Sequence, residues 1–228
     1  MSLYSIILII SLLFPLSLSF DKKLQFYKQW NTLFPALFVV AFFFIASDIA
    51  FTYKGIWGFN SQYLLGVELF KLPIEEWLFF IIIPYASIFL HDSIVHYFPK
   101  FQLQKKTTQI VSIVLVLLSI IIIVFNFDRI YTATIFIGLA TTLLFTILFK
   151  SKSLSSFYLT FIVIIIPFFG VNALLTGSYI HEEVVWYNAQ EIIGFRITTI
   201  PIEDFAYAFV LIFLNLWVRE FFISKLKK

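Results

Sequence analysis

Long apolar stretches with few charged residues constrain this chain more than any other feature. A helix needs about 20 apolar residues to cross a bilayer. Such stretches occur at seven places, near residues 2–20, 31–51, 73–95, 108–127, 130–149, 157–176 and 201–223. Only 13% of the residues are charged, whereas soluble domains carry about 25%. The sequence therefore predicts an all-α, polytopic transmembrane bundle of about seven spans and excludes a soluble globular protein.

The distribution of lysine and arginine predicts the orientation of this bundle. The first stretch lacks the basic segment of a signal peptide, so we count it as a span. The loops on one side then hold 12 of the 16 basic residues, and the other side holds only Lys54, Lys71, Arg129 and Arg196. The positive-inside rule places the amino terminus outside and the carboxyl terminus in the cytoplasm, as in a multi-pass protein of the cell membrane. The net charge of +3 comes from these loops and does not indicate a nucleic-acid partner.

The two halves of the chain match each other at a constant spacing along the sequence. The matched pairs are Asn60 with Asn188, Gly66 with Gly194, Pro73 with Pro201, Glu75 with Glu203, and Glu76 with Asp204. A small gap extends the match to Trp57 with Trp186 and to Asp48 with Asn172. We expect a first repeat of three helices at 1–100, a connector helix at 101–129 and a second repeat of three helices at 130–228. Corresponding spans are four apart and run in the same direction, so the repeats should be parallel, with the functional site near their interface.

Charged residues inside a membrane are costly and by default mark function. Here two acids follow a proline at the start of the third and seventh spans: Glu75 and Glu76 after Pro73, and their counterparts after Pro201. Acids at a helix start also occur simply because the helix dipole favours them. The duplication, together with Asp48 and Asn172 at the same depth, favours a functional cluster at the outer boundary.

Other polar motifs are weaker candidates. His91-Asp92 and its counterpart Arg219-Glu220 lie near the far ends of their spans, with His91 about 24 Å along the helix from Glu75. We interpret them as interfacial ion pairs or contacts with lipid headgroups. His181-Glu182-Glu183 is a poor metal site, and the chain has no cysteine and no nucleotide-binding motif. We therefore expect no cofactor and no metal.

The doubled acidic motif, the stretch from Gly55 to Asn60 and the stretch from Pro73 to Phe80 resemble the membrane-integral lycopene cyclases. These are the heterodimeric or fused type, and the chain is similar to a fused version over about residues 30–224. The resemblance implies four catalytic acids, Glu75, Glu76, Glu203 and Asp204. As residues that contact substrate or support the site we add Asp48, Asn172, Trp57, Trp77 and Trp186. The implied partners are lycopene, an apolar C40 polyene, and the lipid bilayer that supplies it. Self-association and association with other carotenoid-pathway enzymes stay open.

The implied reaction is an isomerisation that closes β-rings at the ends of lycopene, giving γ-carotene or β-carotene. A protonated carboxyl, Glu75 or Glu203, donates a proton, and a carboxylate, Glu76 or Asp204, removes one. Two alternatives stay open at this point. A carotenoid hydratase would add water to the same cation, and a non-enzymatic membrane carrier would use the carboxylates as ion sites. Whether the two acidic pairs form one site or two is also open.

Overall fold

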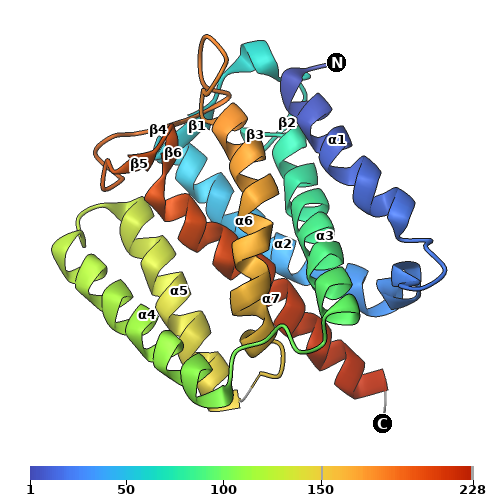
Figure 1. Cartoon of the computed structure of the whole chain (residues 1–228). Helices are drawn as coiled ribbons and strands as arrows, with labels where there is room; N and C mark the ends of the chain where they lie inside the picture. The colour runs from blue at the N-terminus through green and yellow to red at the C-terminus, as the bar shows by residue number, and fades with distance from the viewer. Residues whose placement is uncertain (150, 227–228) are drawn as a thin grey trace.

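A computed structural model describes residues 1–149 and 151–226 of the chain, and helices dominate it (Figure 1). The helices in these ranges are α1 (Leu3–Leu18), α2 (Trp30–Tyr53), α3 (Ile74–Tyr97), α4 (Lys105–Phe125), α5 (Ile130–Phe149), α6 (Leu154–Leu175) and α7 (Ile202–Leu226). Each predicted span coincides with one of them to within a few residues, so the all-helical prediction is confirmed. Lys150, Lys227 and Lys228, which entered the charge count, lie outside the described residues.

Six of these helices, α2 to α7, are long and apolar enough to cross a membrane. The chain is therefore an integral membrane protein. The first predicted span is shorter than expected, because α1 has 16 residues, or about 24 Å of helix. Ser2 caps its start by accepting a hydrogen bond from the backbone N–H of Ser5, and the helix ends at Leu18, just past Pro15.

The helices are arranged as two similar halves. Helix α1 packs beside α3 at one side of the bundle, and α5 packs beside α7 at the other (Figure 1). Between the halves, α2 packs against α7 and α3 against α6. Helix α4 packs on α5 at the outer edge and links the halves. This arrangement is the one expected for two parallel three-helix repeats.

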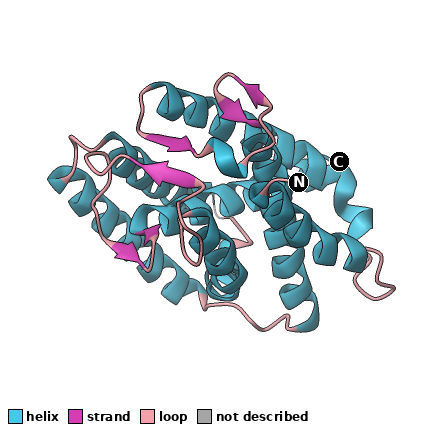
Figure 2. Cartoon of the chain, turned by 90° about the horizontal axis from the view of Figure 1, so that it is seen from above, coloured by secondary structure: helices cyan, strands magenta, loops and turns pink. Residues whose placement is uncertain are grey.

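Short strands form a cap over one end of the helices (Figure 2). β1 (Trp57–Phe59) pairs with β4 (Val185–Tyr187) in an antiparallel ladder that joins the two halves. Two hairpins, β2 (Glu68–Leu69) with β3 (Leu72–Pro73) and β5 (Arg196–Ile197) with β6 (Ile200–Pro201), lead directly into α3 and α7. The cap thus fixes where both acidic helices begin.

The hydrogen bonds of this ladder show which residues of the two halves correspond in the cap. The N–H of Asn60 donates to the carbonyl of Val184 at 2.9 Å, and the N–H of Asn188 donates to the carbonyl of Ile56 at 2.8 Å. The spacing between Asn60 and Asn188 therefore holds throughout the strands, and Trp186 is the counterpart of Gly58. The gapped match of Trp57 with Trp186 was wrong. The insertion lies earlier, in the loop between α6 and β4, which is longer than the loop between α2 and β1.

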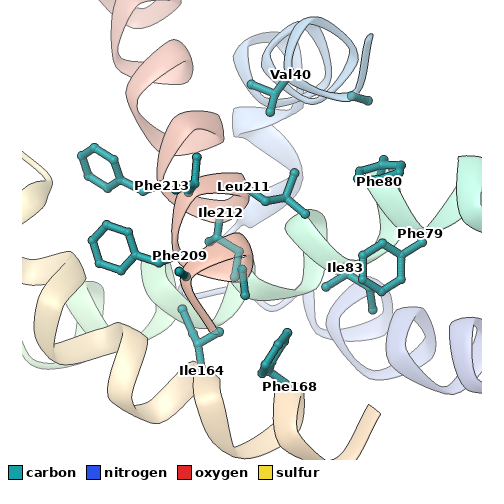
Figure 3. Close-up of a cluster of buried hydrophobic side chains, with 14 of the residues drawn as sticks. Val40, Phe79, Phe80, Ile83, Ile164, Phe168, Phe209, Leu211, Ile212 and Phe213 are labelled. Atoms are coloured by element: carbon teal, nitrogen blue, oxygen red, sulfur yellow. The ribbon is translucent and has the colours of Figure 1, made fainter. Parts of the chain in front are cut away.

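Apolar side chains fill the space between the two halves below the cap. Val40, Phe79, Ile164 and Leu211, from four different helices, are buried in this core (Figure 3). Helices in lipid associate mainly through close van der Waals contact. The core therefore holds the halves at a fixed distance, and the cap sits over it.

The polar pairs at the other end of the bundle form the expected ion pair. Arg219 of α7 donates two hydrogen bonds to the carboxylate of Asp92 on α3, at 2.6 and 2.8 Å. Glu220 accepts a hydrogen bond of 2.8 Å from the N–H of Ser153 at the start of α6. His91 bonds the hydroxyl of Thr160 at 2.7 Å. These residues tie helix ends together far from the cap.

Candidate active site

The four acids of the duplicated motif lie in the first turns of α3 and α7. Each helix starts directly after a hairpin whose last residue is Pro73 or Pro201. Proline suits this position because the first N–H groups of a helix have no partner within it. The acids point inward and are at most 5% exposed: Glu75, Glu76, Glu203 and Asp204. Burial of four carboxyl groups requires polar partners for each of them.

Glu75 and Glu203 have matching surroundings. Oε1 of Glu75 accepts hydrogen bonds from the N–H of Leu65 at 2.7 Å and from the hydroxyl of Ser2 at 2.8 Å. Oε1 of Glu203 accepts from the N–H of Ile193 at 2.7 Å and from the hydroxyl of Thr132 at 2.6 Å. Each side chain therefore ties its helix to the preceding loop and to the start of the neighbouring helix, α1 or α5.

The second acid of each pair is held by tyrosine. Tyr4 donates to Oε2 of Glu76 at 2.5 Å. Asp204 has two such donors, Tyr131 at 2.8 Å to Oδ1 and Tyr187 at 2.9 Å to Oδ2. Hydrogen bonds from phenols hold a carboxyl group in one orientation and stabilise negative charge on it.

These tyrosines were not predicted, although the sequence carries a signal for them. Tyr4 and Ser5 of α1 match Tyr131 and Thr132 of α5 once the spacing of the repeat is shortened by a single position. A second gap would have extended the repeat to the first helix and placed a tyrosine beside each acidic pair. In the structure both tyrosines are buried at the start of their helices.

Glu76 and Asp204 line the same cavity, which lies between the halves directly under the cap. Glu75 and Glu203 are not among the described residues that line it. The two acidic pairs therefore contribute one carboxyl group each to a single central site. The cavity has a volume of about 40 Å³, little more than the space of one water molecule. Its other walls are mostly apolar and aromatic.

An aromatic cluster covers the cavity on the cap side. The rings of Tyr131 and Tyr187 have centroids 5.5 Å apart, and Trp57 lies 5.8 and 5.9 Å from them. Tyr207 lies 6.3 Å from Trp57. Burial first, and then the nearby carboxylate of Asp204, raise the pKa of Tyr187 well above its usual range. Tyr187 thus stays protonated and remains a donor, and the ring faces can stabilise a cation.

Asp48 and Asn172, which sequence analysis placed together, have different positions. Asn172 lines the cavity, whereas Asp48 does not. Asp48 is fully buried and accepts a hydrogen bond of 3.1 Å from Tyr207, which does line it. Asp48 is therefore hydrogen-bonded to the cavity wall through Tyr207.

Of the three tryptophans expected at the site, only Trp57 lines the cavity. Trp77 follows the acids in α3 and is not among the described residues of the cavity wall. Trp186 is 39% exposed on β4, and its ring covers Gly58. Glu182, from the weak metal motif, accepts a hydrogen bond of 2.8 Å from Asn60 and so links the cap loops.

Comparison with known proteins identifies the family. The family model described as lycopene cyclase matches residues 1–94 and 128–222, which include nearly all of both helix triplets and leave out the whole of α4. Neither a search of curated proteins nor a search of solved structures found a match. The matched segments contain all four acids and the tyrosines that hold them. The chain therefore belongs to the lycopene cyclase family and is a membrane-integral carotenoid cyclase.

Proposed function

We propose that this enzyme is a lycopene β-cyclase that needs no cofactor. The observation that carries the proposal is the placement of Glu76 and Asp204 on one small, largely apolar cavity, each held by tyrosine hydroxyl groups. Cyclisation of lycopene is redox-neutral and requires one proton donor and one proton acceptor. Two carboxyl groups facing the same cavity satisfy that requirement.

The geometry supports Glu76 as the donor and Asp204 as the acceptor. The sequence suggested Glu75 or Glu203 as the donor, but both bond backbone and hydroxyl groups and lie behind the cavity wall. Asp204 accepts from two phenols and Glu76 from one. The carboxylate with more donors carries negative charge more favourably. Asp204 is therefore the group that is ionised at rest and can accept a proton, and Glu76 is the group that stays protonated and can donate one.

The reaction then balances within the cavity. Protonated Glu76 adds its proton to the terminal carbon–carbon double bond, which leaves a tertiary cation on the neighbouring carbon. The next reactive double bond attacks this cation, and the new carbon–carbon bond closes a six-membered ring. The cation now lies on a ring carbon. Asp204 removes the adjacent ring proton, which gives the β-ring, and the proton returns to Glu76 within the same cavity.

The surrounding residues support each stage of this reaction. The ring faces of Trp57, Tyr131 and Tyr187 stabilise the cation as it forms and moves. Apolar side chains such as Phe79, Ile83 and Leu211 form much of the cavity wall, which favours proton loss over capture of the cation by water. A hydratase requires a water molecule beside the cation. Product mass separates the two activities, since cyclisation conserves mass and hydration adds one water.

The distribution of basic residues supports an orientation with the amino terminus and the cap outside. The chain has no cysteine, so single cysteines can report the side of the membrane. Ser178→Cys, in the cap, should react with a membrane-impermeant thiol reagent in intact cells. Lys105→Cys, at the start of α4, should react only after lysis. The reverse pattern would overturn this orientation.

The activity is tested by expressing the chain in bacteria that accumulate lycopene. We expect the pigment to shift from red to orange-yellow, with an unchanged mass and with one-ring and two-ring products separable by chromatography. Glu182→Gln serves as a control, because this carboxylate lies in the cap outside the cavity. Unaltered lycopene beside well-expressed, membrane-inserted protein would contradict the proposal. A product heavier by one water would favour the hydratase.

A further inference from the structure

Two apolar grooves run along the outside of the bundle below the cap. The first groove lies between α1, α3 and α6, has a volume of about 400 Å³ and is lined by Phe14, Ala86 and Phe168 among others. The second groove lies between α2, α5 and α7, has a volume of about 230 Å³ and is lined by Phe44, Gly138 and Leu214 among others. Both are lined by residues of the helices and not of the loops.

The repeat relates the two grooves to each other. Helices α1, α3 and α6 correspond to α5, α7 and α2. At the level of residues, Ser11 corresponds to Gly138, Ala86 to Leu214, and Phe168 to Phe44. The smaller side chain of Ala86 leaves space in the first groove that Leu214 fills in the second.

The grooves differ most where they meet the cavity. Ile83 and Phe168 line both the first groove and the cavity, so only apolar side chains separate these two spaces. Both residues belong to the core between the halves (Figure 3). The second groove meets the cavity at Tyr207. Tyr207 donates to Asp48, and its ring stands edge-on to Phe44 with centroids 5.2 Å apart.

We propose that the first groove holds the polyene chain of the substrate while one end group occupies the cavity, and that Ile83 and Phe168 form the apolar gate between them. This inference rests on the proposed function. The second groove is closed to the substrate at its inner end, because opening it would break the buried hydrogen bond between Tyr207 and Asp48. Substrate thus reaches the site from the lipid by one of two related routes.

The chemistry of the first groove fits this occupant. A C40 polyene is a long apolar rod that dissolves in lipid, and only its end group undergoes reaction. The cavity holds little more than a water molecule, so the end group can enter only if side chains in the wall move. Ile83 and Phe168 can change rotamer without leaving a polar group unpaired. The groove follows α3 from Ile83 to Leu90, about 10 to 21 Å along the helix from Glu76, so a chain lying in it would point its end at the acids.

The repeat supplies a matched pair of variants to test the route. Ser11→Phe places a ring in the first groove, and Gly138→Phe places the same ring at the equivalent position of the second. No atom beyond its own helix backbone lies within 4 Å of a Cβ added at Gly138. We expect Ser11→Phe to lower the rate of lycopene cyclisation at least tenfold and Gly138→Phe to leave it within about twofold. Equal losses, or a loss only in Gly138→Phe, would overturn the proposal.

A second pair of variants swaps the side chains that differ between the grooves. It tests the same route if a variant of the first pair fails to fold. Ala86→Leu gives the first groove the side chain of the second, and Leu214→Ala does the reverse. Purified protein, normalised for the monodisperse fraction, should show a loss of activity for Ala86→Leu and not for Leu214→Ala. A groove that holds only a lipid acyl chain would leave turnover unchanged in both Ser11→Phe and Ala86→Leu, and this outcome contradicts the proposal.

The wild-type protein separates this inference from the proposed function. If the wild type does not cyclise lycopene, the proposed function fails. If the wild type cyclises lycopene and the two grooves respond alike to their variants, the function stands and the route through the first groove is wrong.

Discussion

The half formed by α1 to α3 and the half formed by α5 to α7 agree in their scaffold and differ in their chemistry. Glu75 and Glu203 each accept a hydrogen bond of 2.7 Å from a backbone N–H and a short one from a hydroxyl group, at 2.8 and 2.6 Å; Glu75 also accepts a longer one of 3.4 Å from Ser5. Glu76 has one tyrosine donor where Asp204 has two. Glu75 and Glu203, which tie helices to loops, thus have similar hydrogen-bond donors in the two halves. Glu76 and Asp204, which face the cavity, have different ones. The comparison separates the acids that tie a helix to the preceding loop from the acids that line the cavity.

The largest expected effect comes from the acids that line the cavity. Glu76→Gln and Asp204→Asn each keep the size of the side chain and remove its ability to donate or accept the reaction proton. We expect at least a hundredfold loss of cyclisation for each, in line with the contribution of acid and base groups, about 10² to 10⁴. Product formation per amount of folded protein measures it. Activity near the wild-type level in either variant would remove that residue from the mechanism.

The next largest effect tests why Asp204 differs from Glu76. The counterpart of Tyr187 in the first half is Phe59, which has no hydroxyl group. Tyr187→Phe makes the surroundings of Asp204 resemble those of Glu76 and removes a hydrogen bond to a charged group, worth about 1.5–3 kcal/mol. If that energy is lost in the transition state, turnover falls about tenfold to a hundredfold. Unchanged turnover in the folded variant would show that the second phenol does not set the role of Asp204.

The surroundings of Tyr187 also predict when its phenol ionises. Burial and the Asp204 carboxylate raise its pKa well above the usual range, so the phenol should not ionise as the pH rises through 10. Ultraviolet titrations of the wild type and of Tyr187→Phe should give the same phenolate absorbance near pH 10, because Tyr187 stays protonated there. A wild-type excess signal there would show that Tyr187 is not held as the structure has it.

A smaller effect, on stability, should be equal in the two halves. Glu75→Ala and Glu203→Ala each remove a part-buried hydrogen bond from the N–H of Leu65 or Ile193, which costs about 0.5–1.5 kcal/mol. Glu75→Gln keeps Oε1 as an acceptor and should remain active. Thermal unfolding in detergent and turnover measure the two properties. Loss of turnover in stable Glu75→Gln would restore Glu75 as a donor and contradict the assignment of Glu76.

The smallest effect concerns the acid that has no carboxylate counterpart. Asp48→Asn keeps an oxygen acceptor for Tyr207 and gives this position the side chain of Asn172. We expect turnover within about threefold of the wild type, because a neutral hydrogen bond contributes only about 0.5–1.5 kcal/mol. Asp48→Leu removes the acceptor and should lower activity further. Equal activity of the two variants would show that the bond from Tyr207 does not matter for the site.

The helices were predictable because lipid imposes length and apolarity on every spanning segment. Residues 130–149 were expected to form a span and form α5 with those bounds. The first span was overestimated, because apolar composition continues to Phe20 whereas the helix ends at Leu18. Composition reports which residues can lie in lipid and does not report where the chain turns.

The site was only partly predictable. Proline followed by acids marked Glu76 and Asp204, because that pattern is local. The partner of Glu76 is Tyr4, 72 residues away, and no local pattern links them. Trp186 was expected at the site, and only the strand ladder shows that it pairs with Gly58 in the cap. Contacts between helices and register between strands depend on the whole fold.

That ladder has a further consequence for how such a duplicated protein evolves. Gly58 and Trp186 are counterparts and also face each other, so they lie on the pseudo-twofold axis between the halves. A Cβ at position 58 would lie 2.3 Å from the ring of Trp186. In a symmetric pair of identical chains, the residue on the axis must meet a copy of itself. Two tryptophans there would collide, and two glycines would leave a hole. A single chain that encodes both halves is free of this constraint and can place a large residue opposite a small one.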